Sequence, residues 1–484
     1  MTNSIVESSE AYTSQLRWCR LNNPSVQNFL MACVLFCNPG LYLAILGLGA
    51  GGGQASSLLM AQVSNACLYA VFAVTGILGG TILTKIGPRW TVLLAISGYP
   101  LYTGSLWYFD KSGGQLWFPL LSGCWLGFSG GCLWTTASFM ANVYASESEK
   151  GAFRAIQWTG NSVGATVGAG IAFAINFNAQ TPSTPQSVYI IFIVLQCASA
   201  SFALLMVDPN KLIRPDGTPV AIFRPTTLKE SIVALGSMFK DWRLILMLPA
   251  FFTPEAFIVL QSSLNAYAFN LRTRSLNNVL SYACQIPVAL FVGYGLLDNK
   301  RLGSRRRRGL LTIGFDAIWI TGTYIALTLW LHSWGFDRSM PGPNIDIEDA
   351  AWPGAVALYV LYGSQYGIFQ NTVLWVLGSM SNEPKLMAHL GGVMVCFISA
   401  GTAVSFGIDS ASVPYEAENG LWFALSTLTW PILAFVTYKY VRPTNYFVEE
   451  GVGIPVEMQN GQLDSQKVEV EKGLNVVNVE TGAV

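Results

Sequence analysis

Charged residues and histidines are scarce in this chain. Only 11% of its 484 residues are Asp, Glu, Lys or Arg, and the two histidines are His332 and His389. So little charge beside 52% hydrophobic residues lies outside the range of soluble globular domains. The 27 basic and 27 acidic residues also balance, so nucleic-acid binding is not indicated. We therefore predict an integral membrane protein, with the lipid bilayer as its first partner.

The residues that hold metals or act as nucleophiles form no recognisable site. Most of the nine cysteines fall inside long apolar runs. Cys33 and Cys37 share a helical face, but two histidines are too few to complete a metal site. The sequence contains no nucleophile elbow, zinc-protease helix or phosphate-binding loop. We therefore expect no metal, no cofactor and no enzyme activity.

Long apolar runs recur along the whole chain. A helix needs about 20 apolar residues to cross the hydrocarbon core of a bilayer. This predicts an all-α membrane protein with twelve transmembrane helices. The twelve runs cover approximately residues 26–46, 59–84, 91–109, 117–140, 153–177, 187–207, 243–269, 277–297, 309–331, 354–378, 386–408 and 419–438.

Basic residues are distributed unevenly over the segments that connect these runs. If the N-terminus is cytoplasmic, the inner segments hold 21 Lys and Arg residues and the outer loops hold 4, with Lys467 and Lys472 of the tail left out. Positive charge is retained on the cytoplasmic side of membrane proteins. We therefore predict a multi-pass protein with cytoplasmic N- and C-termini, in the plasma membrane or in a vacuolar or endosomal membrane.

One polar stretch divides the runs into two sets of six. Residues 208–242 contain four prolines and are predicted to form a cytoplasmic linker. A six-helix bundle is expected on each side, at residues 26–207 and 243–438. The chain would begin with a cytoplasmic segment, 1–25, and end with a polar, acidic and disordered tail, 439–484.

Two short loops, half a chain apart, resemble each other. The first reads GTILTKIGPR from Gly80 to Arg89, and the second reads GLLDNKRLGSRRRR from Gly295 to Arg308. Each begins with glycine at the end of an apolar run and then turns through a second glycine into basic residues. Such a repeat indicates an internally duplicated membrane protein.

Two acidic residues fall inside the predicted helices. A charge in the hydrocarbon region costs several kcal/mol unless it is paired or hydrated, so each is a functional candidate. Glu255 follows Pro254 near the middle of the seventh run. It is either a proton-coupling carboxylate or a protonated group that caps carbonyls freed by the proline, and both interpretations stay open. Asp316 lies nearer the cytoplasmic third of the ninth run and is interpreted as structural, because a shift of a few residues in the boundary would bring it to the cytoplasmic interface.

Uncharged polar and aromatic side chains are also scattered through the predicted helices. Each one alone is more often an interhelical hydrogen bond than a ligand contact. Together they indicate a polar central cavity for a small organic solute or an ion. The candidates for this cavity are Glu255, Asn38, Trp134, Gln157, Asn161, Gln261, Asn265, Tyr366 and Gln370.

The first of the paired loops resembles the loop motif of the major facilitator superfamily. That motif has a glycine, three residues, an acidic residue, a basic residue, any residue, a glycine and two basic residues. Thr84 stands here at the acidic position and Pro88 at the first of the two final basic positions. The residues that match the motif are Gly80, Lys85, Gly87 and Arg89.

Longer segments narrow this resemblance to one branch. They lie between Asn38 and Pro384 and are similar to the uncoordinated-ninety-three-like branch of the superfamily. The segments are NPGLYLAILGLGAGGGQ, IGPRWTVLLAISGYPLY, EKGAFRAIQWTGNSVGA, NLRTRSLNN and LYGSQYGIFQNTVLWVLGSMSNEP.

The resemblance implies two six-helix bundles around a cavity lined mainly by spans 1, 4, 7 and 10. It implies either a transporter that works by alternating access or a non-transporting regulatory or trafficking partner of another membrane protein. In relatives the acid of the loop motif pairs with a nearby Arg and holds the cytoplasmic gate shut. Because Thr84 replaces that acid, we expect gating contacts to depend on Asp298 and Arg301 more than on Lys85 and Arg89.

Overall fold

The computed structural model describes residues 20–47, 57–177, 186–220, 239–449 and 452–460, with four further residues between 229 and 236. Regular secondary structure in this part of the chain is helical, apart from two isolated bridges, Ile213–Pro219 and Phe269–Ile345. The predicted all-α fold class is thus confirmed. The predicted N-terminal segment up to residue 19, most of the linker after residue 220 and the tail beyond residue 460 lie outside the described residues.

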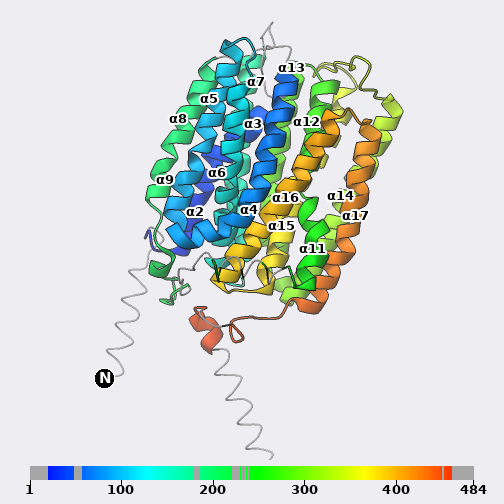
Figure 1. Ribbon diagram of the computed structural model, residues 1–484. Helices are drawn as coiled ribbons and strands as arrows, with labels where there is room; N and C mark the ends of the chain where they lie inside the picture. Colours follow the sequence, from blue (N-terminus) through cyan, green and yellow to red (C-terminus); the bar gives the residue numbers. More distant parts are fainter. Residues whose placement is uncertain are drawn as a thin grey trace, which may run out of the picture.

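The first half of the chain forms six helical rods (Figure 1). Rod one combines α2, a π-helical turn η1 and α3. Rods two and three are formed by α4 and α5, rods four and five by α6 and α7, and rod six by α8 with α9. The bounds are α2 Pro24–Leu35, η1 Phe36–Gly40, α3 Leu41–Gly47, α4 Ser57–Ile96, α5 Gly98–Lys111, α6 Trp117–Val143, α7 Lys150–Asn176, α8 Gln186–Ala198 and α9 Ala200–Leu204.

The second half forms six more rods, after a short 3₁₀ turn, η2 (Pro209–Lys211). Rod seven consists of α11 and α12, and rod eight of α13 with a π-helical end, η3. The 3₁₀ turn η4 then leads into four unbroken rods. The bounds are α11 Trp242–Phe252, α12 Phe257–Ala268, α13 Leu271–Leu290, η3 Phe291–Leu297, η4 Lys300–Leu302, α14 Arg305–Trp334, α15 Trp352–Met380, α16 Pro384–Ser410 and α17 Tyr415–Tyr440.

Eight helical segments of the described chain are long and apolar enough to cross a membrane. One of them, Leu59–Lys111, is 53 residues long and contains both rods two and three. The rods α6, α7 and α15, with 27, 27 and 29 residues, are as long as most of these eight segments, but glycine and polar side chains lower their mean hydropathy. Within the described residues the rods number twelve, as predicted. The exact limits of the two bundles as separate domains stay a prediction.

Helix α4 changes direction at Gly87. This residue has φ 77° and ψ 166°, which is not helical and which side chains with a Cβ rarely adopt. Pro88 follows, and its ring fixes φ near the helical value, so the next helix starts at once. The loop predicted between rods two and three is therefore reduced to a single glycine.

Rod seven is interrupted near its middle. Helix α11 ends at Phe252 and α12 begins at Phe257. Pro254 lies in the gap, and proline lacks the N–H that a helix interior requires. The backbone leaves the helix for the four residues 253–256 and carries Glu255 on this irregular turn.

Two helix pairs join the halves of the molecule: α4 packs along α16, and α7 packs along α13 (Figure 1). Glycines permit these close approaches. A Cβ at Gly76 would lie 2.6 Å from the backbone nitrogen of Cys396, and one at Gly293 would lie 2.6 Å from the carbonyl oxygen of Gly151. Helix α2 begins and α17 ends at the same face of the molecule, the lower one in Figure 1, which we call the terminal face. The opposite face is called the loop face.

Alanine at Gly164 and at Gly170, both in α7, should affect stability in opposite ways. A Cβ at residue 164 would lie 2.1 Å from the carbonyl oxygen of Phe36, whereas nothing lies within 4 Å of a Cβ at residue 170. We expect Gly164→Ala to destabilise the protein by about 1–3 kcal/mol through overpacking. Gly170→Ala should be neutral or stabilising by up to about 1 kcal/mol, because alanine favours helix. Thermal unfolding in detergent measures both, and equal Tm values would contradict this packing.

Candidate functional site

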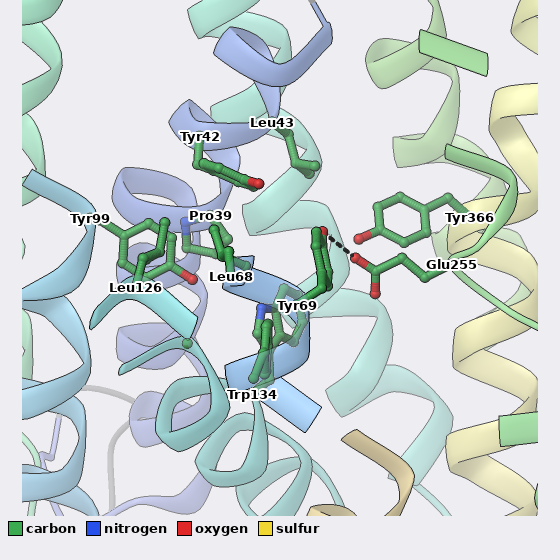
Figure 2. Close-up of a pocket in the computed structure, with 12 residues that line it drawn as sticks. Pro39, Tyr42, Leu43, Leu68, Tyr69, Tyr99, Leu126, Trp134, Glu255 and Tyr366 are labelled. Atoms are coloured by element: carbon green, nitrogen blue, oxygen red, sulfur yellow. Dashed lines mark hydrogen bonds between the residues drawn. The ribbon is translucent and has the colours of Figure 1, made fainter. Parts of the chain in front are cut away.

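A small cavity lies at the centre of the molecule, between the two halves (Figure 2). Its volume is about 30 Å³, which is room for roughly one or two water molecules. Rods one to four supply most of the wall, and the break in rod seven and helix α15 close it from the second half. The lining residues are Pro39, Tyr42, Leu43, Leu68, Tyr69, Phe72, Tyr99, Leu126, Gly130, Trp134, Glu255 and Tyr366.

Glu255 carries the only carboxylate among these lining residues. The Tyr69 hydroxyl donates a hydrogen bond to Oε1 over 2.9 Å (Figure 2), and the Gln370 amide donates to Oε2 over 3.2 Å. The Tyr366 hydroxyl also hydrogen-bonds this carboxylate. Tyr69 belongs to the first half and the other two donors to the second. Glu255 therefore ties the halves together across the cavity.

A buried arginine stands behind the cavity wall. Arg154, one turn into α7, is 3% exposed, and its guanidinium lies 5.6 Å from the ring centroid of Trp134 and 5.3 Å from that of Trp158. Nη2 also donates to Oε1 of Gln370 over 3.4 Å. The Gln370 amide thus accepts from the guanidinium and donates to Glu255, and so connects the base to the acid.

Arg154 is missing from the cavity residues that the sequence predicts, because it lies at the cytoplasmic end of the fifth apolar run, where basic residues are expected. A signal was nevertheless present. Arg154, Gln157 and Asn161 recur at positions i, i+3 and i+7, which places them on one helical face. A basic residue that begins a polar stripe on an otherwise apolar helix indicates a position inside the bundle.

Two of the candidates in the first half make structural hydrogen bonds instead of facing the cavity. The Asn38 amide donates to the carbonyl oxygen of Val34 over 2.9 Å and to the Ser199 hydroxyl over 2.8 Å. The Gln157 amide donates to Oδ1 of Asn28 over 2.8 Å. Both side chains hold neighbouring rods of the first half together.

Three more candidates lie away from the cavity. The Gln261 amide donates to the Ser281 hydroxyl over 3.2 Å, and the Asn265 amide donates to Oδ1 of Asn278 over 3.2 Å. Both bonds lie within the second half. Asn161 is fully buried, and neither atom of its amide has a hydrogen-bond partner among the described residues. Of the nine candidates, the structure brings Glu255, Trp134, Tyr366 and Gln370 together at the cavity.

Asp316 lies eleven positions after Arg305, about one third of the way along α14, and is 0% exposed. At a rise of about 1.5 Å per residue it sits roughly 16 Å inside the bundle. It is therefore a second acid in the interior, away from the lining of the central cavity.

Asp298, the acidic residue of the second loop, closes the terminal face. Its carboxylate accepts hydrogen bonds from the backbone N–H of Gly151 over 3.1 Å and of Ala152 over 2.5 Å. These groups belong to the first turn of α7, so a side chain of the second half caps a helix of the first.

The expected pairing of Asp298 with Arg301 is corrected by this geometry. The Arg301 side chain is exposed, and Arg308 is the base whose charge acts on Asp298. The physical reason is that the first turn of a helix presents N–H groups with no partner inside the helix, and α7 brings two of them within reach of the carboxylate.

The other gate candidates lie on α4 near its kink. Lys85 is exposed, and Nε of Arg89 donates to the carbonyl oxygen of Met206 over 2.7 Å, within the first half. Gly80 packs against the second half, because a Cβ there would lie 2.8 Å from the carbonyl oxygen of Ala388. Of the first loop, Gly80 thus contacts the opposite half, and Gly87 forms the kink.

Contacts between the halves also close the loop face. Arg338 donates to Asp409 over 2.6 Å and to Glu418 over 2.7 Å, all within the second half. The Gln62 amide of α4 donates to the other oxygen of Asp409 over 3.0 Å. The central cavity is therefore enclosed between two sets of contacts that join the halves.

The sequence is similar to proteins of one family. A family model described as ion channel regulatory protein UNC-93 matches residues 61–254. An uncharacterized membrane protein of Schizosaccharomyces pombe is 39% identical over 398 residues, which are 82% of this chain and 81% of that protein. UNC93-like protein 1 of Arabidopsis thaliana is 30% identical over 433 residues, 89% of this chain and 93% of that protein.

A third relative and a solved structure complete the comparison. Notoamide biosynthesis cluster protein O' of Aspergillus versicolor is 26% identical over 401 residues, 82% of this chain and 84% of that protein. The structure of a proton:xylose symporter of the major facilitator superfamily is similar with a TM-score of 0.60, 11% identity and coverage of 86% of this chain and 95% of that chain. At this identity the structural likeness shows the fold alone.

Stability should depend on pH through Asp298. Burial raises the pKa of this carboxyl from 3.8 to about 7, although two backbone N–H groups partly offset the effect. An acid whose pKa is raised by folding favours the folded state below its unfolded pKa, and this contribution is lost as pH rises through the folded value. We expect Tm to fall between about pH 4 and pH 7.

Asp298→Asn keeps an acceptor for α7 but cannot ionise, so this variant should lose that part of the pH dependence. Differential scanning fluorimetry of both proteins across this pH range provides the measurement. If the Tm of the wild type and the Tm of the variant changed in parallel with pH, the pH dependence could not be assigned to Asp298.

Proposed function

The chain belongs to the UNC-93 family and has the fold of the major facilitator superfamily, and from this premise we propose that it is a membrane transporter of a small solute. It would work by alternating access, in which the two halves rock about the central cavity. The observation that carries the proposal is the position of that cavity. It lies between the halves, with contacts that can break on either side of it.

Glu255 is the proposed coupling group. The charged carboxylate accepts hydrogen bonds from Tyr69 of one half and Gln370 of the other. Hydrogen bonds to a charged acceptor are about twice as strong as neutral ones, so a proton on Glu255 would weaken this tie. Loading and release of the proton would then alternate with opening of the halves.

The closed cavity has room for only about one or two water molecules, so a solute would enter after one face opens. The wall residues then favour an organic solute. Aromatic rings form half of the wall, and one carboxylate supplies the charge. Rings and a carboxylate together suit an amine or another organic cation. The name of one relative, Notoamide biosynthesis cluster protein O', assigns that protein to a biosynthesis cluster, which supports a metabolite as the solute.

The terminal face is proposed to lie in the cytoplasm. The inner segments carry 21 basic residues against 4 in the outer loops, as the positive-inside rule requires. The plasma membrane and a vacuolar or endosomal membrane stay the two proposed locations.

Glu255→Gln should uncouple transport from protons. Liposomes with the protein and an imposed proton gradient would be given a mixture of small organic amines and neutral metabolites, and accumulation would be measured by mass spectrometry. We expect gradient-driven accumulation to fall to the level reached without a gradient, because glutamine cannot bind and release a proton, while solute exchange without a gradient persists. Asp316→Asn is the matched control, because it makes the same change at another buried acid away from the cavity, and it should keep coupling. Equal gradient-driven accumulation by Glu255→Gln and wild type would exclude the coupling role.

A second candidate function is regulation of another membrane protein. The observation in its favour is the description of the matching family model as an ion channel regulatory protein. Such a role needs an outer surface that binds a partner within the bilayer, and exposed apolar side chains are present there, for example Val74 and Ile318.

The two functions differ in what purified protein does alone. A regulator should copurify at fixed stoichiometry with one channel or receptor and show no flux in liposomes. A transporter should move solute without any partner. Chemical crosslinking in native membranes followed by mass spectrometry, together with the liposome experiment, separates these outcomes, and flux by the isolated protein would rule out a purely regulatory role.

A further inference from the structure

A second and larger cavity lies on the terminal face. Its volume is about 390 Å³, and the transport mechanism does not use it. Five parts of the chain surround it: the α6–α7 loop at 146–149, the linker at 214–216, Lys300 of η4, the start of α14, and the segment after α17. The first half, the second half and the C-terminal segment therefore meet here.

Two arginines that line this cavity are buried without hydrogen-bond acceptors. Arg305 and Arg308 are 4% and 6% exposed. The guanidinium nitrogens of Arg305, and Nε and Nη1 of Arg308, make no hydrogen bond with the described residues. Nη1 of Arg305 lies 3.2 Å from Oε1 of Glu147, as an ion pair without hydrogen-bond geometry. Buried charged donors without a hydrogen-bond acceptor are costly even when an ion pair balances their charge, so these two guanidinium groups indicate a missing acceptor.

The carboxylates of the cavity are already engaged. Oε1 of Glu147 accepts from the Asn382 amide over 2.6 Å and from the backbone N–H of Asn445 over 2.8 Å. Asp216 accepts from the backbone N–H groups of Thr218 and Val456 over 3.0 Å each.

The two remaining acids are engaged as well. Glu149 accepts from the Ser146 hydroxyl over 2.7 Å, and Glu457 pairs with Lys300 at 3.9 Å. Acids and bases are equal in number along the wall, namely Glu147, Glu149, Asp216 and Glu457 against Arg214, Lys300, Arg305 and Arg308. The free hydrogen-bonding capacity nevertheless lies with the bases.

We propose that this cavity binds a phosphate monoester, whose oxygens accept hydrogen bonds from Arg305 and Arg308. Guanidinium groups match phosphate in shape and charge. Arg214, whose Nε is also unpartnered among the described residues, supplies a further donor from the linker. The phosphate comes either from a soluble ester or from a phosphoinositide headgroup at the membrane surface.

Such a ligand would hold the terminal face closed. The walls of the cavity come from both halves and from the C-terminal segment. Nη1 of Arg214, in the linker, donates to the carbonyl oxygen of Gly453 in that segment over 2.7 Å. The complete site exists only while these parts are together. A ligand that binds only this arrangement stabilises it by linkage, so the cavity is a regulatory site distinct from the central one.

The test is thermal unfolding of the purified full chain. Inositol trisphosphate and inorganic phosphate serve as soluble probes, with sodium chloride at equal ionic strength as the blank. Vesicles that contain phosphatidylinositol bisphosphate are compared with phosphatidylserine vesicles of equal charge. We expect Tm to rise with a phosphate ester and not with the blanks.

Variants of the arginine run locate the site. Arg308→Gln should weaken the apparent affinity about tenfold or more, the effect of losing a charged hydrogen bond, and Arg308→Lys should restore part of it. Arg307→Gln is the matched control, because Arg307 is the exposed neighbour in the same run and does not line the cavity. Its effect should stay below about twofold. If Arg308→Gln does not fold, Lys300→Gln, at a largely exposed position of the wall, replaces it and should weaken binding severalfold.

Each outcome decides the proposal. A response to soluble esters assigns a soluble ligand, and a response to phosphoinositide vesicles alone assigns a lipid headgroup. No response to any phosphate probe, or equal weakening by Arg307→Gln and Arg308→Gln, would overturn the site.

Discussion

The cost of holding an acid and a base inside a membrane protein governs the centre of this molecule. Glu255 and Arg154 both lie in the interior, away from bulk water. An isolated charge in such a place costs several kcal/mol. The amide of Gln370 connects them, and Trp134 and Trp158 lie against the cation. The polar groups at the centre thus act as hydrogen-bond partners for one another. Removal of one of them leaves another without its partner in an apolar surrounding.

The helices are shaped so that these groups can meet. Pro254 breaks rod seven and frees the turn that carries Glu255, and irregular backbone is tolerated at this depth because protein surrounds it. Gly151 of α7, together with Gly76 and Gly293, lets the rods approach until hydrogen bonds between the halves become possible. Close backbone contact therefore comes first, and the polar centre depends on it.

The two faces are closed by different chemistry. At the terminal face the Asp298 carboxylate binds the N-terminal turn of α7. At the loop face Gln62 of the first half binds Asp409, which Arg338 holds in place. A carboxylate accepts the contact between the halves at both faces. The donors differ, because they are backbone N–H groups of a helix at the terminal face and a side-chain amide at the loop face.

Apolar length, charge distribution and local motifs were enough to predict the class of fold, the number of rods and the family. They also pointed to Glu255, since an acid inside an apolar run is costly unless a break in the helix, here at Pro254, gives it polar partners. The meeting of particular polar residues, in contrast, could not be predicted in this way. Like Gln370, the residues Asn38, Gln157, Gln261 and Asn265 are amides inside apolar runs. These four, however, form hydrogen bonds within their own half. The partner that each side chain reaches depends on the rotation and contact of rods far apart in the chain, and residue spacing within one rod does not contain that information.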